Sequence, residues 1–113
     1  MAAQVLDTFV TVTLDGSGDG TASLYPESFR TWTVTTINVR TSQTPTQTPV
    51  PQCTVYLGST GDGNIVSQTW MGNRSTATGS LVVQPSQPLI FVWENGVSGS
   101  TATASVYGTM NLR

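Results

Sequence analysis

The acidic residues with the most suggestive spacing lie in the segment Asp15-Gly16-Ser17-Gly18-Asp19-Gly20. Oxygen-bearing side chains at alternate positions, followed by glycine, match the first half of a calcium-binding loop. The second half does not match, because the position eleven residues after Asp15, which should supply a bidentate glutamate, is Pro26. We therefore interpret residues 15–20 as a polar turn and predict no metal site, with calcium binding by Asp15 and Asp19 kept as the alternative.

Side chains that enzymes use for nucleophilic, acid–base or metal chemistry are scarce in this chain. It contains no histidine, no lysine and one cysteine, Cys53. These absences exclude the usual zinc site, a Ser-His or Cys-His nucleophile pair, and a lysine Schiff base. No spacing places two of the six acidic residues opposite each other, as glycoside hydrolysis requires. We therefore predict a protein without catalytic residues, cofactor or internal disulfide.

The charge balance also limits the partners. Four scattered arginines and a net charge of −2 cannot form the basic patch that nucleic-acid phosphates require. No apolar run approaches the roughly 20 residues of a membrane-spanning helix. We predict no nucleic-acid or membrane partner. Aromatic side chains can stack on sugar rings, and a glycan partner is kept as an alternative, with Trp70 beside a polar loop and outward-facing Tyr56 as the candidate binding residues.

The elements that would position these residues are short strands. Apolar residues alternate with threonine and serine, which is typical of half-buried strands, whereas no window shows a helical stripe. A parity switch inside the third segment predicts a β-bulge near Thr35 and Thr36. The predicted strands span residues 4–14, 21–25, 29–41, 53–57, 65–71, 81–83, 89–94 and 101–112, and a polar loop is predicted over residues 72–79.

Eight short strands with Gly, Pro and Asn turns predict an all-β fold of two packed antiparallel sheets. Residues 42–52 hold three prolines and read as a semi-rigid connection that crosses between the sheets. This long connection favours a jelly roll over a meander. An immunoglobulin-like sandwich is the alternative, although the Cys…Trp…Cys spacing is absent. A chain of 113 residues has room for one such domain, spanning residues 1–113.

The surface of the predicted sandwich is unusual in its lack of charge. The chain contains 20 threonines and 12 serines but only 10 charged residues. Soluble sheet proteins usually guard exposed edges and faces with charge, especially lysine. The predicted outer faces carry hydroxyls and amides instead, with Arg30 and Arg40 as exceptions. We therefore expect much of this surface to be covered in a homo-oligomer, for which a trimer is favoured, with residues 1–14 as a possible docking strand or arm.

The order of short motifs also resembles a known family. Five short motifs follow one another along the chain. They are a strand with Trp (Trp32), a V-Y-x-G strand (Val55 to Gly58), a proline-bounded corner (Pro85 to Pro88), an apolar strand with Trp before a Gly turn (Trp93 and Gly96), and a closing Ala/Thr/Val strand with Gly (Gly108). This order is similar to that of small all-β virion proteins of tailed bacteriophages, especially those that infect actinobacteria. The resemblance implies a non-enzymatic structural role on the virion, as capsid decoration or as a tail or fibre component, with other virion proteins as partners.

Overall fold

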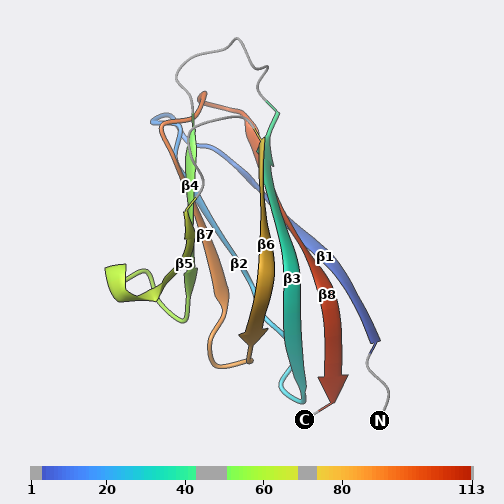
Figure 1. Cartoon of the computed structure of the whole chain (residues 1–113). Helices are drawn as coiled ribbons and strands as arrows, with labels where there is room; N and C mark the ends of the chain where they lie inside the picture. The colour runs from blue at the N-terminus through green and yellow to red at the C-terminus, as the bar shows by residue number, and fades with distance from the viewer. Residues whose placement is uncertain (1–3, 43–50, 69–73, 113) are drawn as a thin grey trace.

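The computed structural model describes residues 4–42, 51–68 and 74–112, which form eight β-strands and one turn of 3-10 helix (Figure 1). In chain order the elements are β1 (Gln4–Thr13), β2 (Gly20–Leu24), β3 (Arg30–Thr41), β4 (Gln52–Leu57), η1 (Asp62–Asn64), β5 (Ile65–Gln68), β6 (Arg74–Val83), β7 (Leu89–Glu94) and β8 (Thr101–Leu112).

The strands form two four-stranded antiparallel sheets that face each other as a sandwich (Figure 1). Sheet A has the order β1-β8-β3-β6, and sheet B has the order β2-β7-β4-β5. The pairing is nested, because β1 pairs with β8, β2 with β7, β3 with β6, and β4 with β5. β3 and β4 lie in different sheets, so the chain changes sheets between them as predicted. Residues 43–50 of the predicted semi-rigid connection lie outside the described residues. The all-β sandwich predicted from the sequence is therefore the observed architecture.

Most strand positions agree with the sequence prediction. The predicted ranges 89–94 and 101–112 coincide with β7 and β8. β1, β3 and β4 differ from prediction by one residue at one end, and β2 begins and ends one residue earlier than predicted. β7 lies between β2 and β4, as its apolar sequence predicted for a central strand. The register of β3 shifts between Val34 and Thr36 against both of its neighbours, which confirms the predicted bulge.

The sixth strand is the main correction to the predicted fold. Residues 74–79 were expected to belong to a polar loop, but β6 begins at Arg74 and continues to Val83. Ser75, Thr76 and Thr78 pair with β3 in register, which shows that hydroxyl-bearing residues extend a strand where a neighbour supplies the ladder. Residues 72–73 of the predicted loop and 69–71 of the predicted fifth strand lie outside the described residues.

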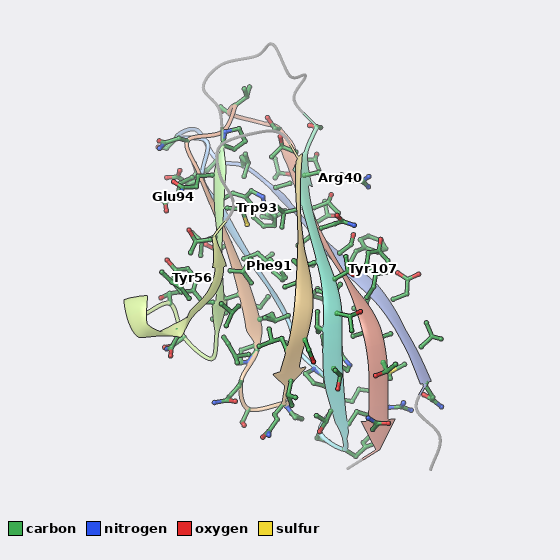
Figure 2. All side chains as sticks on the ribbon, in the orientation of Figure 1. Arg40, Tyr56, Phe91, Trp93, Glu94 and Tyr107 are labelled. Atoms are coloured by element: carbon green, nitrogen blue, oxygen red, sulfur yellow. The ribbon has the colours of Figure 1, made fainter. Side chains whose placement is uncertain are left out.

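The core lies between the sheets and is built from alternate residues of nearly every strand. Phe91 and Trp93 point from β7 toward sheet A (Figure 2), and their rings stack with centroids 6.1 Å apart. Trp32 on β3 is also buried, as its position in an apolar alternation predicted. Ala102, Ala104 and Val106 on the inner face of β8 are fully buried. The small alanines leave room for the large rings of the opposite sheet.

The single cysteine behaves as part of this core. Cys53 on β4 is 2% exposed, and burial raises the pKa of its thiol to about 12. Because the thiolate is the reactive species and the sulfur is shielded from solvent, the folded protein at pH 8 should react with a disulfide reagent at least about tenfold more slowly than the urea-unfolded chain. Absorbance from released thionitrobenzoate measures both rates. Complete labelling of the folded protein at the unfolded rate would contradict the buried position of Cys53.

Candidate functional site

The outer face of sheet A carries continuous rows of hydroxyl groups. The alternation in β8 places one set of side chains outward, as predicted: Thr101, Thr103, Ser105, Tyr107, Thr109 and Asn111. β3 continues the rows with Thr31, Thr33, Thr36 and Asn38 in register with β8. The Thr11 and Thr103 hydroxyl oxygens lie 3.5 Å apart across β1 and β8. Tyr107 projects from the middle of this face (Figure 2).

Four large apolar side chains stand exposed on the same face. Val5 and Phe9 on β1 are 79% and 66% exposed, Val82 on β6 is 51% exposed, and Tyr107 is 37% exposed. The exposure of Val5 and Phe9 was not predicted from the sequence. Their odd parity could have revealed them, because the inward residues of β1 are Leu6, Val10 and Val12.

Charge on this face is sparse. Among the described side chains, Asp7 on β1 and Arg40 on β3 carry the charges of its outer rows. The expectation that Arg30 also lies on the outer face is wrong, because Arg30 shares the parity of Trp32 and turns toward the seam between the sheets. Its Nη1 donates a hydrogen bond to Gln4 Oε1 over 2.6 Å, and its Nε lies 3.5 Å from Glu27 Oε2.

A groove of about 430 Å³ opens where the edge strands β1 and β2 separate. Its apolar wall is formed by Leu6, Leu24, Trp32 and Met110, and its rim carries Gln4, Asp7, Tyr25, Glu27 and Arg30. The Arg30 guanidinium is fixed at this rim by Gln4, by Glu27 and by the ring of Phe29, whose centroid lies 5.3 Å away. The groove therefore adjoins the exposed β1 edge and has a partly polar border.

The candidate calcium loop is a structural turn at the opposite end of β1. The Asp15 carboxylate Oδ1 accepts hydrogen bonds from the backbone N–H groups of Ser17 and Asp19, over 2.8 and 3.1 Å. Asp19 Oδ1 accepts from the backbone N–H of Asn95 over 3.1 Å, which ties this turn to the β7–β8 connection. Both carboxylates thus face N–H donors, which is the arrangement of a capped turn and differs from a ring of oxygen ligands.

Asp15 gives this turn a pH dependence. The hydrogen bonds from the backbone of Asp19 and then of Ser17 lower the pKa of Asp15 below its ordinary value of 3.8. A lowered pKa in the folded state contributes stability above the unfolded pKa, and this contribution is lost as the pH falls through the folded pKa. The stability difference between the wild type and Asp15→Asn should therefore be largest near neutral pH and shrink below about pH 4.

Urea denaturation at a series of pH values measures this difference. Because Asp15 is exposed, solvent screening keeps the effect modest, and added salt should reduce it further. A difference that stays constant from neutral to acid pH would show that the charge of the carboxylate does not contribute.

The two glycan-binding candidates are not brought together by the described structure. Tyr56 on β4 is half-buried and projects from the outer face of sheet B (Figure 2), in register with Ile90 and Ile65. Thr54 shares this outward parity but is only 4% exposed. Trp70 lies outside the described residues. Glycan binding at Tyr56 and Trp70 therefore stays a prediction from the sequence.

Comparison with known proteins adds no relative. No family model, no curated protein and no solved structure matches the chain. Within residues 4–42, 51–68 and 74–112, no three Cys, Asp or Glu side chains gather in a way that could hold a metal ion. In the same part of the chain, no helix combines the length and apolarity that crossing a membrane demands.

Proposed function

We propose that this protein is a non-enzymatic structural component of a tailed-phage virion, which associates with its own copies and docks on the particle exterior as capsid decoration or as a tail or fibre component. The observation that carries the proposal is the outer face of sheet A together with its β1 edge. Hydroxyl rows and four exposed apolar side chains, Val5, Phe9, Val82 and Tyr107, share this surface with the charges of Asp7 and Arg40.

The physical basis of the proposal is the low cost of covering such a surface. Removing an ionised side chain from water is expensive unless it finds a partner, whereas a hydroxyl group costs less to desolvate. The exposed aromatic and branched side chains gain from burial. Large apolar side chains that are exposed together on one face of a soluble protein are typical of an interaction site. The composition of this face therefore favours permanent contact with other protein surfaces.

The topology supports the same role. The nested order β1-β8-β3-β6 and β2-β7-β4-β5 is the order expected when a long hairpin is rolled into a jelly roll, and we interpret the sandwich in this way. Jelly rolls are frequent in viral capsid domains. The motif order at Trp32, Val55 to Gly58, Trp93 and Gly108 resembles phage virion proteins, and this resemblance supports the virion location.

Sedimentation equilibrium of the full chain tests self-association. The mass should exceed the 11.9 kDa of one chain at micromolar concentration. Because the surface is nearly neutral, raising the salt from about 50 mM to about 500 mM should leave the association constant almost unchanged. A single-chain mass at every concentration would contradict self-association. Mass spectrometry of purified particles of the phage that encodes the chain tests the virion location, which absence from those particles would exclude.

A further inference from the structure

The outer edge of β1 is an unpaired template for another strand. β1 is the terminal strand of sheet A and pairs only with β8 among the described strands (Figure 1). All ten residues of β1 pair with β8 without a register shift, from Gln4 opposite Met110 to Thr13 opposite Thr101. In an antiparallel edge strand, alternate N–H and C=O groups point away from the sheet. β1 therefore offers a long and regular row of backbone donors and acceptors.

The other three edge strands lack this combination of features. β2 has five residues, and short edges are poor templates for strand addition. The described part of β5 pairs with β4 across a register shift. β6 has ten residues, but it contains Gly79, begins at Arg74, and pairs with β3 across a register shift. β1 contains no lysine, proline or glycine, and Asp7 is its one charged residue. The residues that usually prevent strand addition are thus missing from the long and regular edge of β1.

Exposed apolar side chains also lie beside the free edge of β1. Val5 and Phe9, both on β1, are the two most exposed large hydrophobic side chains among the described residues. The groove between β1 and β2 opens along the same edge and adds the apolar surface of Leu24 and Met110. A strand laid against β1 would satisfy the free backbone groups and cover these side chains at once.

We propose that the occupant of this edge is β1 of a second copy, paired antiparallel about a two-fold axis at Phe9. This inference rests on the proposed self-association and specifies its surface. With the axis at Phe9, the two phenyl rings face each other, Val5 lies opposite Thr13, and Asp7 lies opposite Thr11. The pairing joins the two sheets A into one continuous sheet, and the interface is the same patch on both copies.

The position of the axis follows from charge and chemistry. An axis at Asp7 would place two carboxylates directly opposite each other, which destabilises an antiparallel pair. An axis at Thr8 would place each Asp7 opposite the apolar ring of Phe9. The axis at Phe9 gives Asp7 a hydroxyl partner in Thr11 and forms an aromatic pair, which is favourable across strands.

Two matched variants test the surface by sedimentation equilibrium. Phe9→Lys places two ammonium groups face to face at the axis, and it should raise the dimer dissociation constant by at least about tenfold. Val66→Lys adds the same charge at an exposed position on β5, an edge strand of sheet B, and should change the constant by less than about threefold. Both positions are exposed, so circular dichroism should show an unchanged fold.

Cysteine pairing tests the register. An equimolar mixture of Asp7→Cys and Thr11→Cys should form a disulfide-linked dimer on mild oxidation, because these positions face each other across the axis. Each variant by itself should form far less, since four residues separate the introduced thiol from its own copy along the partner strand, about 13 Å. The native Cys53 is buried and should not interfere.

The outcomes separate the inference from the proposed function. A wild-type chain that stays monomeric overturns both. A wild-type trimer overturns the two-fold pairing and leaves the proposed self-association standing. A dimer that survives Phe9→Lys but dissociates with Val66→Lys also overturns the β1 pairing only. A dimer lost with Phe9→Lys and trapped by the cysteine mixture supports the pairing at Phe9.

Discussion

Replacing Gly108 with alanine should lower the free energy of unfolding by about 3 kcal/mol or more, at or beyond the upper end of what overpacking usually costs. A Cβ atom at this position would lie 2.0 Å from the carbonyl oxygen of Thr33 and 3.1 Å from the backbone nitrogen of Thr35. Both of these atoms belong to the backbone of β3, next to its bulge, where Gly108 on β8 lies opposite Val34. Neither atom can move aside as a flexible side chain would, so the central strand pair of sheet A must separate.

Urea denaturation of Gly108→Ala and of a matched variant, Gly16→Ala, measures the effect. A Cβ at Gly16 meets nothing within 4 Å. The control should therefore unfold close to the wild type, or up to about 1 kcal/mol more stably because alanine restricts the unfolded chain. An insoluble Gly108→Ala beside a soluble Gly16→Ala would support the same conclusion. If Gly108→Ala unfolds within about 1 kcal/mol of the wild type, the close approach of β3 and β8 is contradicted.

The close approach of Gly108 to β3 could be predicted only in part from the sequence. The parity switch after Val34 is visible in the sequence because apolar residues move from even to odd positions, and it predicted the bulge. The inward parity of Gly108 is equally visible from the alternation of β8. Their contact is not visible, because it depends on which residue of one strand lies opposite which residue of another. That register is fixed by the packing of both sheets, and the sequence pattern of one strand does not contain it.

The candidate surface was likewise predicted only in part from the sequence. The outward row of β8, including Tyr107, was predicted because its alternation is strict over the whole strand. The extent of β6 was missed, because threonine and serine fit a strand and a polar loop equally well until a paired neighbour decides. Arg30 was wrongly predicted to lie on the outer face of its sheet. Its aliphatic stem follows the inward parity of its strand while the guanidinium reaches Gln4 at the open end of the seam.

The largest loss of stability from removing a side chain is expected for Trp93→Ala. Trp93 is 1% exposed and points from the central strand of sheet B into the core. Removing a buried aromatic side chain of this size typically costs about 3–5 kcal/mol, through lost burial and the cavity left behind. The stacked ring of Phe91, 6.1 Å away, loses its aromatic partner as well. Because small domains are stable by only about 5–15 kcal/mol, this single change should bring the protein close to unfolding.

Guanidinium denaturation of three variants tests this expectation. Trp93→Phe keeps an aromatic ring against Phe91 and should lose less than half as much stability as Trp93→Ala, so it gives a measurable value even where the alanine variant is unfolded at the start. Tyr25→Ala removes an aromatic side chain that is 63% exposed and should change the stability by no more than about 0.5 kcal/mol. Equal losses for Trp93→Ala and Tyr25→Ala would contradict a core centred on β7. The graded order is expected because the two sheets are held together by inward rings, and the outer hydroxyl rows add little to the stability of a single copy.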